Sequence, residues 1–167
     1  VTASDQGIYV AGMGADESVT ITDNTINAPF GMYVGGPHDD STIESNEITA
    51  STNGVLIESG GGNNAGNTLT LDSNTITLDG DESGIKVVKA SSPLTVNILN
   101  NEIEDGTTAD DSGEDETAGI RLQEVVSDIT GSIVIEENSF TEIDGTAEIL
   151  ANNFQSYGID SINSEST

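Results

Sequence analysis

The chain has 167 residues, with 30 Asp or Glu against 3 Lys or Arg, so its formal net charge is −27. A surface this acidic repels the phosphates of nucleic acids and of anionic lipids, which excludes nucleic acid as a direct partner. The absence of cysteine excludes disulfides and thiolate metal sites, and no apolar run approaches the ~20 residues of a membrane-inserted helix.

The first predicted element is a strand at residues 7–10, where a glycine precedes alternating aliphatic residues in Gly7-Ile8-Tyr9-Val10. Alternation of this kind predicts a half-buried strand. This glycine motif is repeated along the chain, and its first copies are roughly two dozen residues apart, a period that is typical of solenoids. The pattern returns at Gly31, Gly54, Gly84 and Gly119, with a degenerate sixth copy at Gly158.

A second motif lies between these strands. It consists of an aliphatic residue, two further residues, Asn, one residue, and then Ile or Phe, as in Leu71-Asp72-Ser73-Asn74-Thr75-Ile76. No stretch keeps the apolar spacing of a helix for three turns, so the two motifs together predict an all-β repeat protein. The asparagines of the motif are Asn24, Asn46, Asn74, Asn101, Asn138 and Asn152.

The interleaved motifs resemble the parallel β-helix repeats of the pectate-lyase-like superfamily, from Gly7 to about Ile162. The resemblance implies a right-handed parallel β-helix, or β-solenoid, of about six coils with three parallel sheets. It is nearly silent on function, because the same solenoid serves lyases, epimerases, tailspikes, adhesins and surface filaments. We expect residues 1–167 to form a single β-helix domain, a fragment or processed unit of a larger surface protein or a filament subunit.

Five asparagines are predicted to form a structural ladder inside the bends of the solenoid. An Asn tolerates the left-handed backbone conformation, and its amide can both donate a hydrogen bond to the equivalent residue one coil away and accept one. The alternative is that these are exposed turn residues, present for the left-handed conformation alone. The predicted ladder is Asn24, Asn46, Asn74, Asn101 and Asn138.

The third residue of each glycine motif points outward if the coils stack, and this forms a column on one sheet. Its tyrosines could stack on sugar rings, and in the β-helix lyases that the chain resembles, a Lys or Arg on such a face acts as a base beside carboxylate-bound calcium. We favour the alternative, a stabilising Tyr–Tyr stack with cations paired to carboxylates. The predicted glycan or partner face is Tyr9, Tyr33, Leu56, Lys86 and Arg121, with Asp160 as the sixth member.

Residues 36–40, Gly-Pro-His-Asp-Asp, resemble the Asp-Pro-His-Asp stretch of alginate C5-epimerases. Here Gly36 stands in place of the first Asp, and His38 is the only histidine of the chain. With so few basic residues to hold a polyanionic uronate, we interpret this match as chance.

The longest interruption of the repeat, residues 104–117, carries seven carboxylates. Clustered oxygen ligands suit calcium, but their spacing matches neither an EF-hand nor a glycine-rich nonapeptide calcium repeat. A solvated acidic loop is the expectation, and calcium is the one cofactor that the sequence suggests. The alternative is a weak calcium site at Asp110, Asp111, Glu114, Asp115 and Glu116.

These features favour a non-catalytic structural solenoid, a building block of a microbial surface filament, stalk or adhesin. Its expected partner is itself, stacked end to end, or the neighbouring coils of a longer chain. The alternative is a polysaccharide-active (lyase- or epimerase-like) or glycan-binding β-helix. An extracellular or cell-surface location in saline surroundings suits the charge, because the Debye length falls from about 10 Å at 0.1 M salt to about 3 Å at 1 M.

Overall fold

The computed structural model describes residues 1–11, 17–36, 40–58, 68–80, 83–88, 95–106, 118–123, 132–141, 147–152 and 158–166. Of the last two strands it describes the backbone path only. None of the described segments is a helix that could cross a membrane.

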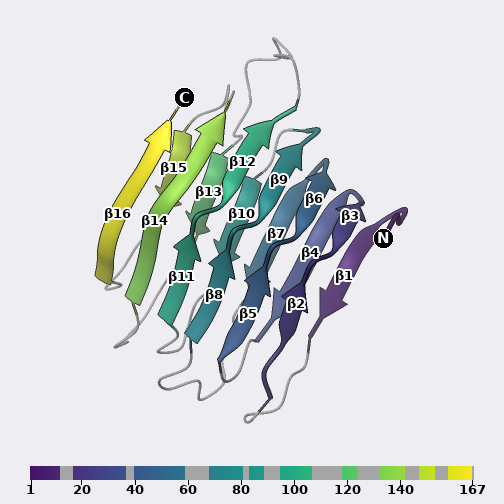
Figure 1. Cartoon of the computed structure of the whole chain (residues 1–167), viewed down its shortest axis with the longest axis horizontal. Helices are drawn as coiled ribbons and strands as arrows, with labels where there is room; N and C mark the ends of the chain where they lie inside the picture. Colours follow the sequence, from purple (N-terminus) through teal and green to yellow (C-terminus); the bar gives the residue numbers. More distant parts are fainter. Residues whose placement is uncertain are drawn as a thin grey trace.

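The chain winds into a solenoid whose coils lie side by side, with the N-terminus at one end and the last strands at the other (Figure 1). Each coil adds strands to faces that we number 1 to 3 in chain order. Face 1 consists of β1 (Gln6–Val10), β4 (Phe30–Gly35), β7 (Asn53–Glu58), β10 (Ser83–Val88), β13 (Ala118–Gln123) and β15 (Ala147–Asn152). Face 2 consists of β2 (Thr20–Thr22), β5 (Ser41–Glu44), β8 (Thr68–Asp72), β11 (Thr95–Leu99) and the first parts of β14 (Ser132–Thr141) and β16 (Gly158–Ser166). Face 3 consists of β3 (Thr25–Asn27), β6 (Glu47–Ala50), β9 (Thr75–Leu78), β12 (Glu102–Asp105) and the second parts of β14 and β16.

Faces 2 and 3 belong to one hydrogen-bonded sheet that bends along the asparagine motif, whereas face 1 is a separate six-stranded sheet. The continuous strand β14 runs across this bend and pairs with β11 before it and with β12 after it. All named strand pairs are parallel. The predicted all-β parallel solenoid of about six coils is therefore confirmed.

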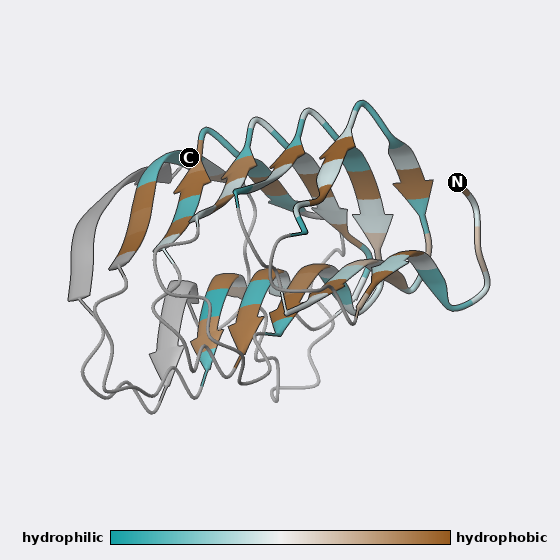
Figure 2. Ribbon diagram, turned by 90° about the horizontal axis from the view of Figure 1, so that it is seen from below, coloured by the Kyte–Doolittle hydropathy of each residue, from teal (hydrophilic) through white to brown (hydrophobic). Residues whose placement is uncertain are grey.

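The core is built from columns of equivalent aliphatic residues, because the register places the same motif position of successive coils next to each other. On face 3, Ile26, Ile48, Ile76 and Ile103 are successive Cα partners, and each is at most 1% exposed. In Figure 2 the hydrophobic bands of neighbouring strands lie side by side. Burying such a side chain contributes roughly 1.5 to 3 kcal/mol, so the columns account for the fold despite the low apolar content.

The two last repeats differ from the prediction. β15, which contains the Asn motif of Ile149 and Asn152, pairs with β13 on face 1, where Ile149 is the partner of Ile120. β16, which begins at Gly158, pairs instead with β14 along both face 2 and face 3, and Gly158 itself is the partner of Ser132 on face 2. The assignment of these two motifs was therefore wrong, because the chain always enters face 1 after face 3 and this order outweighs the local pattern.

Candidate functional site

The five asparagines of the repeat form a continuous row of hydrogen bonds at the bend between faces 2 and 3. The Nδ2 of Asn24 donates to Oδ1 of Asn46 at 3.0 Å, and the same bond joins Asn46 to Asn74, Asn74 to Asn101 and Asn101 to Asn138 at 2.9 Å. Asn46, Asn74, Asn101 and Asn138 are each 1% exposed. An unsatisfied amide at such a position would cost about 1 to 3 kcal/mol, so this row stabilises the stacking of the coils.

Each amide also fixes the backbone around it. The backbone N–H of Asn74 donates to Oδ1 of Asn101 at 3.0 Å, and Nδ2 of Asn74 donates to the carbonyl oxygen of Ile43 at 3.0 Å. Equivalent bonds run from Asn46 to Asn74 and from Asn46 to the carbonyl of Ile21. The row therefore links side chains and backbone of three successive coils at every step.

The left-handed residue of the bend is not the asparagine but the residue before it. Ser73 has φ of 54° and Glu137 has φ of 56°. The expectation that Asn itself adopts this conformation was wrong, because the buried amide must face the next coil while the exposed preceding residue makes the turn. The same positive φ occurs at Asp23, Ser45 and Asn100.

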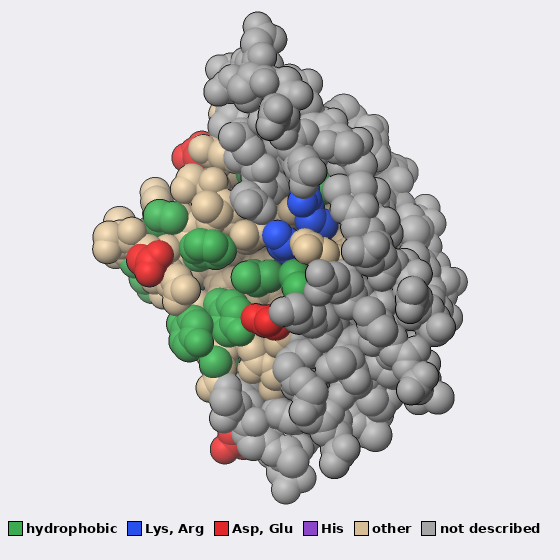
Figure 3. Space-filling model, turned by 180° about the vertical axis from the view of Figure 1, so that it is seen from behind, with side chains coloured by type: hydrophobic (Ala, Val, Ile, Leu, Met, Phe, Trp, Pro, Cys, Tyr) green, Lys and Arg blue, Asp and Glu red, His purple; other side chains and the backbone are tan. Residues whose placement is uncertain are grey.

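The outward column of face 1 brings the predicted partner face together. Tyr9, Tyr33, Leu56, Lys86 and Arg121 are successive Cα partners. The next member is Leu150 of β15 and not Asp160, which lies in β16 on another face. Seen from behind, the molecule shows hydrophobic side chains and Lys and Arg side chains close together on this face (Figure 3).

The tyrosines of this column stack on each other. Their ring centroids are 4.8 Å apart and their planes differ by 10°. Each ring therefore uses one face for the other ring, which leaves the outer face of Tyr9 and the ring edges for a ligand. Tyr9 is 60% exposed, whereas Tyr33 is half-buried.

Glu58 holds the second ring of the stack. The hydroxyl of Tyr33 donates to Oε2 of Glu58 at 3.0 Å. Burial raises the pKa of the Tyr33 phenol above its ordinary value, and the adjacent Glu58 carboxylate raises it further. The phenol therefore stays protonated and keeps its hydrogen bond at neutral pH.

The two cations of the column differ in accessibility. Lys86 is half-buried, but Arg121 is only 6% exposed, so its guanidinium offers little surface to a ligand. The part of the predicted face that is open to a partner is therefore centred on the tyrosines and Leu56 rather than on the cation pair.

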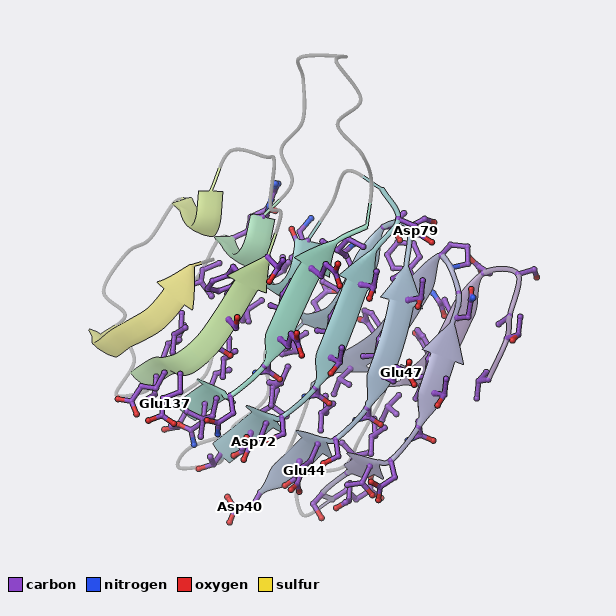
Figure 4. The ribbon with its side chains drawn as sticks, turned by 45° about the horizontal axis from the view of Figure 1, so that its top comes forward. Asp40, Glu44, Glu47, Asp72, Asp79 and Glu137 are labelled. Carbon is purple, nitrogen blue, oxygen red and sulfur yellow. The ribbon has the colours of Figure 1, made fainter. Side chains whose placement is uncertain are left out.

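The described carboxylates are distributed along the outside of the solenoid. In Figure 4, Glu44, Asp72 and Glu137 follow the row of bends, Glu47 begins the strand directly after one bend, and Asp79 lies at the far end of face 3. In the described part of the chain, no group of three or more His, Cys, Asp or Glu side chains could hold a metal ion. The predicted calcium ligands Asp110, Asp111, Glu114, Asp115 and Glu116 lie outside the described residues, as does His38.

Two buried polar residues were not anticipated from the sequence. Asn53 and Ser83 are 4% and 0% exposed, and they are Cα partners on face 1. Among the described residues, neither the Asn53 Oδ1 nor the Ser83 Oγ has a hydrogen-bond partner. Both residues directly precede the glycine of their motif, and this shared position is the sequence signal that marks them.

Comparison with known proteins gives one family. A family model described as a right handed beta helix region matches residues 6–167. No curated protein and no solved structure matches the chain.

Proposed function

Because the chain belongs to the right-handed β-helix family, we propose that it is a non-catalytic, extracellular structural β-solenoid. In this role it is a rigid building block of a microbial surface filament, stalk or adhesin. The observation that carries the proposal is the unbroken asparagine row, which joins five successive coils through four buried amides and the half-buried amide of Asn24. A solenoid of uniform coils is quasi-one-dimensional, so it suits a spacer better than a globular fold of the same length.

The proposed partner of this solenoid is a second copy stacked end to end, or further coils of a longer chain. Strand β1 pairs only with β4 among the described strands, and β2 pairs only with β5. Their other edges therefore carry backbone groups suited to the addition of further parallel strands. The charge of −27 opposes such stacking at low salt, so we place the assembly in saline surroundings.

Electron microscopy and light scattering over a range of protein and NaCl concentrations test this role. We expect rods whose length grows in steps of one molecule, about 29 Å for six coils at roughly 4.8 Å per coil. A particle that stays monomeric at high protein concentration in high salt, with no longer parent chain in the native material, would contradict the proposal.

Glycan binding is the second candidate function, and the exposed ring of Tyr9 is the observation that favours it. An aromatic ring with one open face can pack against a sugar, and Lys86 lies three positions further along the same column. A polysaccharide-active enzyme, lyase- or epimerase-like, would use the same face.

Incubation with neutral and uronate polysaccharides, with and without calcium, tests the second candidate. Binding that is lost in Tyr9→Ala but kept in Tyr157→Ala would support it, and unsaturated products would point to a lyase. If the wild-type protein neither retains nor modifies any of these polymers, the glycan function is excluded.

A further inference from the structure

We propose that Tyr9 and Tyr33 form an oxidative cross-linking site, at which a dityrosine bond joins the first two coils of the solenoid. Their side chains stack with ring centroids 4.8 Å apart and planes within 10° of each other. The two residues are Cα partners in β1 and β4, so the sheet itself holds the rings together. The site does not depend on self-association of the protein.

The pair is accessible to an oxidant at one ring and has a proton acceptor at the other. Tyr9 is 60% exposed, so a one-electron oxidant can reach its ring from solvent. The hydroxyl of Tyr33 donates to Oε2 of Glu58 at 3.0 Å. A carboxylate at this distance can take the phenol proton as the electron leaves, which avoids a high-energy protonated radical.

The co-reactant is hydrogen peroxide, activated by a haem peroxidase. Each phenol loses one electron and its hydroxyl proton, and the proton of Tyr33 passes to Glu58 and then to solvent. The two tyrosyl radicals carry spin density on their Cε atoms, and these atoms couple to form one Cε–Cε bond. The hydrogens on the coupled carbons then move to the oxygens and restore two phenols, so the protein loses two hydrogen atoms while one peroxide becomes two waters.

The product closes a covalent loop around one coil. Such a loop lowers the conformational entropy of the unfolded chain, as a disulfide does, in a protein that has no cysteine. Coils 1 and 2 would then remain joined when the surrounding sheet edges open.

The experiment uses the full chain, which has three tyrosines, the third being Tyr157. Each protein is treated with peroxide and a haem peroxidase and then cleaved at acidic residues such as Glu17, which separates Tyr9 from Tyr33 unless they are bonded. We expect dityrosine fluorescence and a joined peptide pair, lighter by two hydrogen atoms, in the wild type and in Tyr157→Phe. Tyr9→Phe and Tyr33→Phe should lose this product, and Glu58→Gln should form it more slowly.

Phe keeps an aromatic ring in the stack, so these variants are expected to fold, and circular dichroism checks this. A joined peptide that persists in Tyr33→Phe, cross-links only between molecules, or the absence of any dityrosine in the wild type would overturn the proposal. An unchanged rate in Glu58→Gln would overturn the role of Glu58 as proton acceptor.

Discussion

Asn74 is held from both sides, because its Oδ1 accepts from Asn46 and its Nδ2 donates to Asn101 and to the carbonyl of Ile43. We expect Asn74→Ala to lower the free energy of unfolding by roughly 1 to 3 kcal/mol, since it leaves buried groups of two neighbouring coils without partners. Urea unfolding measures this loss. The control is Asn24→Ala, whose side chain is half-buried and accepts no hydrogen bond from the described residues, so a smaller loss is expected. Equal effects at both sites would argue against the buried row.

Glu137 adopts a left-handed backbone conformation with φ of 56°, and its side chain is exposed. For residues other than glycine this conformation costs roughly 1 to 2 kcal/mol, while glycine loses about 0.5 to 1 kcal/mol of extra chain entropy on folding. We therefore expect Glu137→Gly to raise the free energy of unfolding by about 0.5 to 1 kcal/mol. The control Thr75→Gly, in the exposed part of β9, should be destabilised. Destabilisation by both substitutions would refute this account of the bend.

Because the pKa of Tyr33 is raised in the folded state, the free energy of unfolding depends on pH in the alkaline range. The folded state binds the phenol proton more tightly than the unfolded state, so this stabilisation is fully present below a pH of about 10 and is lost as the pH rises through the folded pKa. We expect Tyr33→Phe to show a shallower loss of stability as the pH rises above about 10. Urea midpoints across this range are the measurement, and identical pH profiles would contradict the expectation.

At the scale of the strand, glycine lets the coils of face 1 approach each other. A Cβ on Gly54 would lie 2.5 Å from the carbonyl oxygen of Gly84 and 2.5 Å from Cγ2 of Ile76. We expect Gly54→Ala to cost about 1 to 3 kcal/mol, because a backbone oxygen must move to make room. In Gly106→Ala the nearest contacts are 3.0 Å, so a smaller loss is expected in thermal or urea unfolding. If Gly106→Ala costs as much as Gly54→Ala, close packing does not explain the motif.

Much of the element pattern could be predicted from the sequence, because each motif satisfies a local requirement. The glycine precedes alternating residues that must pack inward, and Asn74 with its equivalents is flanked by aliphatic residues that bury it. The number of hydrogen-bonded sheets, two rather than three, could not be predicted. Faces 2 and 3 count as one sheet because the single strand β14 continues across the bend and pairs on both faces. The placement of Ile149 and Gly158 was also out of reach, since both strands contain apolar residues that fit either face.

The candidate site was less predictable than the fold. The column from Tyr9 to Arg121 follows from the repeat, but the burial of Arg121 to 6% depends on side-chain packing that spacing alone does not determine. The bond from Tyr33 to Glu58 joins adjacent columns, so a comparison of equivalent positions could not find it.

For the whole molecule, a net charge of −27 opposes the compact state through mutual repulsion of the carboxylates. Glu44 and Asp72 are Cα partners on face 2, and like charges in directly opposed positions destabilise a sheet. We expect the urea midpoint to rise when NaCl increases from about 0.1 M to about 1 M, because the salt screens this repulsion. Glu44→Gln should show a smaller rise than the wild type. A midpoint that does not change with salt would argue against a saline setting.

The amide-to-amide hydrogen bonds of the asparagine row all run in one sense, because each Nδ2 donates to the Oδ1 of the next asparagine toward the C-terminal coils. The two ends of the row are therefore chemically different. At the N-terminal end, the amide oxygen of Asn24 is an acceptor, and only a donor can extend the row there. Two such ends cannot satisfy each other about a two-fold axis. Assembly through the row would be heterologous, which produces open polymers with a direction rather than closed dimers.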